Sequence, residues 1–320
     1  MRRRDFAASF AALAMPNLAT AQAPWPSRPL RIVVPFGLGG SADVAARFLA
    51  DPLTQALGQP VVIENRPGGG AVIGTDVVAK APPDGQTLLL MSNTHTANET
   101  LIPHRPYALL RDLVPVAAIN IAFHVLAVHP SLGVRTVAEL IARAKAAPGT
   151  LDYASSGPGT PYHIASEVFA AMAGIRLNHI PFRGSNEART ALLAGQVPMM
   201  FDAIPTMREQ ITGGRLIGLG TTGPARSPLL PEVPAVAESL PGFEAAIWLG
   251  LMAPAGTPPA VIERLHAEVG RVLAAGPVRE AMARGGAEPM PMSVAEFGEF
   301  LRRDVERQRE WIRQAKIEIG

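Results

Sequence analysis

The sequence contains no cysteine, and this absence excludes several kinds of site. Without a thiol, the chain has no disulfide framework, no cysteine ligand for a metal and no cysteine to carry a lipid anchor. The seven histidines form no His-Glu-x-x-His or similar pair, so we expect no metal site and no cofactor. We instead expect each histidine to find its own hydrogen-bond partner within the fold.

The chain also lacks a large surplus of positive or negative charge. The chain has 29 Lys and Arg against 27 Asp and Glu. Removing Arg2, Arg3, Arg4 and Asp5 takes away three basic residues and one acidic residue, which leaves a net charge of zero. Proteins that bind nucleic acid carry concentrated positive charge, so we expect no nucleic-acid partner.

Only the N-terminus combines a basic start with a long apolar stretch. An arginine cluster is followed by an apolar segment from Ala7 to Leu18 and then by small residues. This pattern predicts a signal peptide over residues 1–21, or 1–23 if cleavage follows Ala23. The paired arginines leave both the general secretory and the twin-arginine routes open. No other stretch of 18 apolar residues is free of Pro and charge, so we expect an exported monomer without stable membrane insertion.

Short β-rich runs alternate with helical patterns from Leu30 onward, which predicts an α/β fold with mainly parallel sheets flanked by helices. The first set has expected strands at 31–34, 60–64 and 87–91, with helices at 44–57 and 72–80. The second has expected strands near 125–128, 153, 178–180, 198–201 and 216–219, with helices at 136–147, 162–173, 187–193 and 205–211. The tail from Pro258 indicates helices and no strand.

These two sets predict two lobes with a ligand cleft between them. Because the helices of the tail must cover a sheet elsewhere, we expect residues 24–122 and 224–320 to form one lobe and 123–223 the other. The last helix mixes basic and acidic residues at helical spacing, which is typical of a solvated face.

The strongest local signal is a strand that passes through a glycine turn into a helix. Free N–H groups and the positive end of the helix dipole make such a place suited to anions. The candidate ligand-binding residues here are Phe36, Gly37, Leu38, Gly39, Gly40, Ser41 and Asp43. Two alternatives remain, a purely structural turn and a dinucleotide fingerprint, Gly37-x-Gly39-x-x-Ala42, with Glu64 as the ribose acid.

A similar turn follows the strand around Tyr153, and it provides a second candidate anion site or a simple helix cap. Other strand ends are expected at the same edge of the sheet. The further candidates are Ser92, Asn93, Thr94, His95, Ser155, Ser156, Gly157, Gly159, Thr160, His163, Arg183, Gly184, Ser185 and Asp202. Arg183 suits a ligand carboxylate or a surface role equally. A hydrolase using Ser155 or Ser156 with His163 and Asp202 is a weaker alternative, because no Gly-x-Ser-x-Gly elbow is present.

Several motifs together resemble the Bug, or tripartite tricarboxylate transporter, substrate-binding family. They span essentially the whole mature chain: Trp25 to Arg31, Pro35-Phe36 with Gly39-Gly40, Gly58 to Gly68, Ala81 to Thr87, Asp152 to Ser155, Pro181 to Ser185, Gly195 to Val197, Met200-Phe201-Asp202 and Leu251 to Pro258.

This resemblance implies a type II periplasmic binding protein, a two-lobe Venus flytrap rather than an enzyme. It implies that a small carboxylate is held by backbone N–H groups, hydroxyls and waters from the turns after Phe36, Ser92 and Ser155. Large and small integral-membrane transporter subunits would receive the ligand, while presentation to a sensor kinase is an alternative. Gly37 and Leu38 depart from the family's usual small or Pro residues, so the identity of the carboxylate stays open.

Overall fold

The computed structural model describes residues 25–318. The predicted signal peptide, residues 1–21 or 1–23, lies outside the described residues. Within the described part, ten strands form one sheet in the order β2-β1-β3-β9-β4-β7-β5-β6, and β8 and β10 also pair with β4. The strands are β1 (Leu30–Val34), β2 (Val61–Asn65), β3 (Thr87–Ser92), β4 (Leu113–Val128), β5 (Asp152–Ser155), β6 (Asn178–Pro181), β7 (Met199–Ala203), β8 (Ile217–Thr221), β9 (Ala246–Pro254) and β10 (Ala287–Pro289).

The helices lie mostly where the sequence pattern predicts them, and the α/β fold is confirmed. They are α1 (Ser41–Leu57), α2 (Val72–Ala79), α3 (Asn93–Leu101), α4 (Leu109–Asp112), α5 (Val137–Ala146), α6 (Pro161–Ala173), α7 (Ser185–Leu193), α8 (Ile204–Thr212), α9 (Pro259–Ala274), α10 (Gly276–Arg284) and α11 (Val294–Gln314), with short 3₁₀ turns at Pro130–Leu132 and Val236–Glu238.

The sheet is mixed rather than mainly parallel. β1 pairs in parallel with β2 and β3, and β5 pairs in parallel with β6 and β7. All pairings made by the two long strands β4 and β9 are antiparallel. The expectation of mainly parallel sheets was wrong because it rested on the alternation of strands with helices. That alternation identifies only the parallel strands that helical crossovers join.

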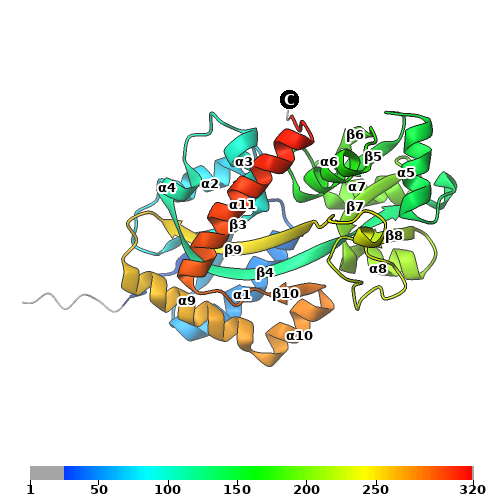
Figure 1. Cartoon of the computed structure of the whole chain (residues 1–320). Coiled ribbons are helices and arrows are strands. Elements are labelled where there is room, and N and C mark those ends of the chain that lie inside the picture. The colour runs from blue at the N-terminus through cyan, green and yellow to red at the C-terminus, as the bar shows by residue number, and fades with distance from the viewer. Residues whose placement is uncertain (1–24, 319–320) are drawn as a thin grey trace, which may run out of the picture.

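The strand β4 connects the two halves of the sheet (Figure 1). From Leu113 to Phe123 it pairs with β9, and from His124 to Val128 it pairs with β7. The pairing partner therefore changes between Phe123 and His124. One half contains β1, β2, β3, β9 and β10, and the other contains β5, β6, β7 and β8.

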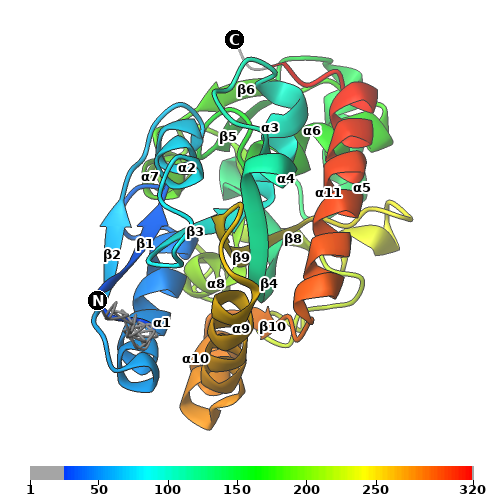
Figure 2. The same ribbon diagram turned by 90° about the vertical axis from the view of Figure 1, so that its left-hand side faces the viewer.

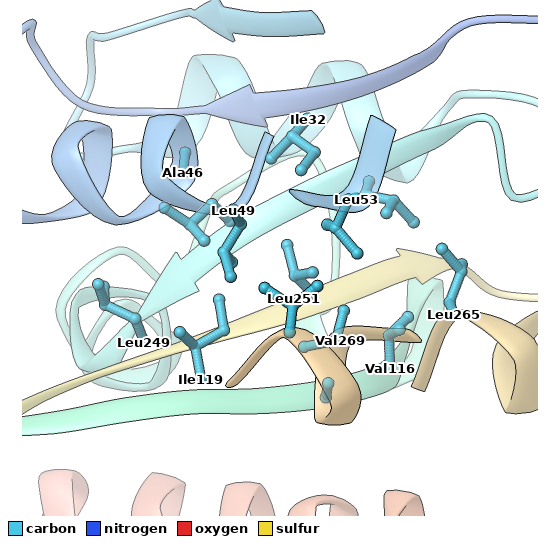
Figure 3. Close-up of a cluster of buried hydrophobic side chains, with 14 of the residues drawn as sticks. Ile32, Ala46, Leu49, Leu53, Val116, Ile119, Leu249, Leu251, Leu265 and Val269 are labelled. Atoms are coloured by element: carbon cyan, nitrogen blue, oxygen red, sulfur yellow. The ribbon is translucent and has the colours of Figure 1, made fainter. Parts of the chain in front are cut away.

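A buried aliphatic cluster holds the first half together (Figure 3). Leu49 and Leu53 lie one helical turn apart on α1, and Leu265 and Val269 lie one turn apart on α9. Both helices present these stripes to the same side of the central strands, where Leu251 is fully buried. Each such side chain contributes about 1.5–3 kcal/mol of transfer free energy. Figure 2 shows α1 and α9 side by side beneath the sheet.

The tail departs from its sequence pattern in two ways. It contains the strand β10, which pairs antiparallel with β4 and which at three residues is too short to show a period. In addition, α11 is not only a solvated surface helix, because Phe297 packs in the first half and Ile312 packs in the second. Asp304, expected among its solvated charges, is 2% exposed.

Candidate functional site

The turn after β1 leads into α1 and is shaped by Asp43. The Gly39 N–H donates to Asp43 Oδ2 at 2.9 Å, and Asn65 Nδ2 donates to Asp43 Oδ1 at 2.9 Å. The Arg47 Nε–H donates to the same carboxylate at 3.0 Å. Burial alone would raise the pKa of Asp43, but these hydrogen bonds outweigh it and hold the pKa below its usual value. Asp43, a ligand-binding candidate from the sequence, is therefore an ionised first-turn residue that fixes the loop.

The rest of this turn is open. Residues 37–41 are exposed, and the Leu38 side chain is 73% exposed. Gly39 has a φ of +75°, a conformation that favours glycine. A Cβ on Gly40 would meet only the Gly37 carbonyl at 3.6 Å, so this position is not needed for packing. Backbone and small residues thus form a surface that a ligand can approach closely.

The N-terminus of α3 lies beside this turn, since the Phe36 and His95 rings meet edge to face at 5.8 Å. Ser92 caps the helix by accepting from the Thr94 N–H at 3.2 Å. Burial lowers the pKa of His95 to about 4, which keeps its imidazole neutral. Three buried polar atoms at this helix start have no hydrogen-bond partner: Asn93 Oδ1, Thr94 Oγ1 and His95 Nε2. They are suited to a polar ligand.

The turn after β5 repeats the arrangement in the second half. The Gly157 N–H donates to Ser155 Oγ at 3.1 Å, and the Thr160 hydroxyl donates to the Gly157 carbonyl at 2.7 Å. The Gly159 N–H donates to His163 Nδ1 at 3.1 Å. Thr160 occupies the N-cap of α6 without capping it through its side chain. The hydroxyls therefore stabilise the loop, and simple capping does not account for them.

A ring stack supports this second turn, and two of its members, Tyr153 and His179, were not predicted as site residues. The His163 and His179 rings stack at 4.2 Å, and Tyr153 stacks on His179 at 4.8 Å. Ser155 Oγ lies 2.6 Å from His179 Nε2. Burial lowers the pKa of His163 to about 3 and that of His179 to about 4. The pairing in parallel of β5 with β6 places Tyr153 opposite His179, a register that spacing along the chain does not reveal.

The proposed hydrolase triad is not assembled. The hydroxyl of Ser155 meets His179 rather than His163. Asp202 instead forms an ion pair with Arg189 at 2.8 Å and also accepts a hydrogen bond from Thr206 at 3.3 Å. Although the attraction of Arg189 lowers it, burial raises the pKa of Asp202 more strongly. Arg189 was not recognised in the sequence because it lies on α7, away from any strand end.

The other candidates from the sequence lie near strand ends, but their contacts in the structure are not those of a shared ligand site. Arg183 is exposed, and its backbone N–H donates to Glu187 Oε2 at 3.3 Å. Gly184 and Ser185 form the N-cap and first residue of α7. Glu64, the acid of the dinucleotide alternative, pairs with Arg31 at 3.0 Å and also with Arg66. Its engagement in ion pairs argues against a ribose-binding role.

The family model of the tripartite tricarboxylate transporter family receptor matches residues 45–317. The chain belongs to this family. The resemblance seen in its motifs is thereby confirmed, although the matched range begins after the turn that follows β1. Among residues 25–318, no helix combines the length and apolar character needed to cross a membrane.

Individual relatives and solved structures are also similar to this chain. BugT of Bordetella pertussis is 39% identical over 286 residues, which are 88% of each chain. The structure of R. palustris Rpa4515 with adipate is 32% identical, with a TM-score of 0.86 over 92% of this chain and 99% of that one. MatC from Rhodopseudomonas palustris with bound malate is 29% identical, with a TM-score of 0.83 over 90% of this chain and all of the other.

Proposed function

We propose that this protein binds a small organic carboxylate in the periplasm and delivers it to the large and small membrane subunits of a secondary transporter. The turns after β1, β3 and β5 supply the binding groups. Residues 24–122 with 224–320 would form one lobe, residues 123–223 the other, and the ligand would lie between them. Adipate on Rpa4515 and malate on MatC support a carboxylate as the ligand class.

One observation carries this proposal. The same local arrangement, a parallel strand followed by a small-residue turn and a helix N-terminus, occurs in both halves of the sheet, at β1–α1 and at β5–α6. Helix N-termini and free N–H groups favour anions. Two such places, one per half, are suited to the two ends of a ligand with two polar groups.

A thermal-shift panel tests the ligand class. We expect at least one of malate, adipate, succinate, citrate, glutamate and benzoate to raise the Tm. An acid at about 100 times its Kd adds roughly 2.7 kcal/mol to the free energy of unfolding. X-ray scattering with the best acid should show a smaller radius of gyration, because both turns must reach one ligand. Failure of every acid to shift the Tm would contradict the proposal.

Gly40→Val tests the turn after β1. A valine there places a side chain where the ligand is expected to approach, and the φ of Gly40 is −75°, so no backbone strain is added. We expect affinity to fall at least tenfold, about 1.4 kcal/mol, by calorimetry. Gly270→Val is the matched control, since Gly270 is exposed on α9 with open space around it. Wild-type affinity in Gly40→Val would leave this turn with a structural role alone.

A further inference from the structure

His124 occupies the point where the two halves of the sheet meet. It is the first residue of β4 to pair with β7, opposite Ala203. Its N–H donates to Thr222 Oγ1 at 2.8 Å, and its carbonyl accepts from the Thr222 N–H at 2.9 Å. Thr222 in turn accepts from the Ala245 N–H at 3.1 Å. The backbone of His124 is thus fixed among the segments that connect the halves.

The side chain of His124 contradicts the expectation that every histidine is satisfied. It is fully buried, and neither Nδ1 nor Nε2 has a hydrogen-bond partner. In contrast, the imidazoles of His163, His179 and His266 each have a polar contact, at 3.1, 2.6 and 2.9 Å respectively. A buried polar group without a partner destabilises a fold by about 1–3 kcal/mol. Such an arrangement calls for an explanation.

His124 contacts the beginning of α6, and its strand shares a buried cluster with α3. Its ring meets the Tyr162 ring of α6 edge to face at 4.8 Å. Leu126, on the same face of β4, packs in one cluster with Tyr162 of α6 and Ala97 of α3. Thr94 lies one helical turn before Ala97 on α3, and its buried hydroxyl is also unpaired. Unpaired polar atoms thus occur both on β4 beside Tyr162 of α6 and at the beginning of α3.

We propose that His124 binds the ligand, together with Thr94, through a polar group distant from the primary carboxylate. The inference rests on the proposed function and narrows its substrate class. A neutral imidazole offers one donor and one acceptor. The acid that satisfies it carries a second oxygen function, a carboxylate or a hydroxyl, rather than a bare alkyl end. Burial lowers the pKa of His124 to about 3, so it recognises this group as a neutral dipole.

Matched acids test the ligand class. We expect adipate to bind at least tenfold more tightly than hexanoate, and malate at least tenfold more tightly than butanoate. Hexanoate keeps the chain length and one carboxylate of adipate but lacks the second carboxylate, and butanoate keeps those of malate but lacks both the hydroxyl and the second carboxylate. Equal affinities within both pairs would overturn the inference and leave carboxylate binding intact. If no acid binds the wild-type protein, the proposed function and this inference both fail.

Variants of His124 separate binding from structure. In His124→Leu we expect the ligand-free Tm to stay or rise, because an unpaired polar group leaves the interior, while adipate or malate affinity falls at least tenfold. His124→Gln keeps a donor and an acceptor and should retain more of the affinity. His266→Leu removes a paired histidine far along the chain on α9 and should leave affinity unchanged.

Two outcomes would assign His124 to structure alone. The first is wild-type affinity in His124→Leu. The second is a lowered ligand-free Tm in both His124→Leu and His124→Gln, with equal losses of affinity. If His124→Leu does not fold, ¹⁵N NMR of the imidazoles in wild-type protein decides, with the His124 signals assigned by their loss in His124→Gln. These signals should move when adipate or malate is added, and unchanged signals would overturn the inference.

Discussion

Converting one carboxylate of the bound acid to a primary amide should weaken binding by about 2–4 kcal/mol, because charge-assisted hydrogen bonds are lost and an amide donor faces N–H donors. Neither the exposed residues 37–41 nor the small-residue turn at 155–160 contains a cationic side chain, so recognition of the acid there is expected to rest on N–H groups and hydroxyls. Calorimetry with the acid and its monoamide measures the difference. The matched methyl ester, which also lacks the charge but adds no donor, should bind between the two.

The same recognition should depend little on salt. The cations beside the turns already have partners, since Arg47 pairs with Asp43 and Arg189 pairs with Asp202. Dipoles in a closed site are screened less than exposed ion pairs. Affinity should therefore change only slightly between low and moderate ionic strength. A steep loss with salt, combined with abolished binding in Arg183→Ala, would show that an ion pair with Arg183 dominates.

Asp304→Ala should lower the free energy of unfolding by about 1–3 kcal/mol, because it leaves the buried Trp248 Nε1–H without an acceptor and leaves the Thr96 hydroxyl only the Asn93 carbonyl. Asp304 on α11 accepts from the Thr96 hydroxyl of α3 and from the Trp248 Nε1–H of β9, the latter at 3.2 Å. Arg307 also pairs with it. One carboxylate thus joins the C-terminal helix, a long strand and the helix that begins at the candidate site.

Urea unfolding measures this loss, and Glu299→Ala is the matched control. Glu299 pairs with Arg302 at the same spacing on the same helix, but both side chains are more than half exposed. Such a pair contributes about 0–1 kcal/mol. Equal effects of the two substitutions would show that the buried contacts of Asp304 stabilise the fold no more than a surface ion pair does.

The candidate site was partly readable in the sequence. The turns at 36–43 and 155–160 were found because glycines and small polar residues between a strand and a helix have few alternative structures. Tyr162, His179 and Arg189 were missed as contributors because their roles depend on neighbours brought by other elements. His124 was misjudged for the same reason, since nothing along the chain shows whether an imidazole finds a partner.

The sequence by itself determined the α/β class, most helix positions and the family, because periodicity and turn chemistry act over a few residues. Only the tertiary structure decided the antiparallel pairing of β4 and β9, the short strand β10 and the burial of Asp304. These features depend on which segments meet across long separations along the chain. The packing that brings those segments together also determines which buried polar atoms remain without a partner.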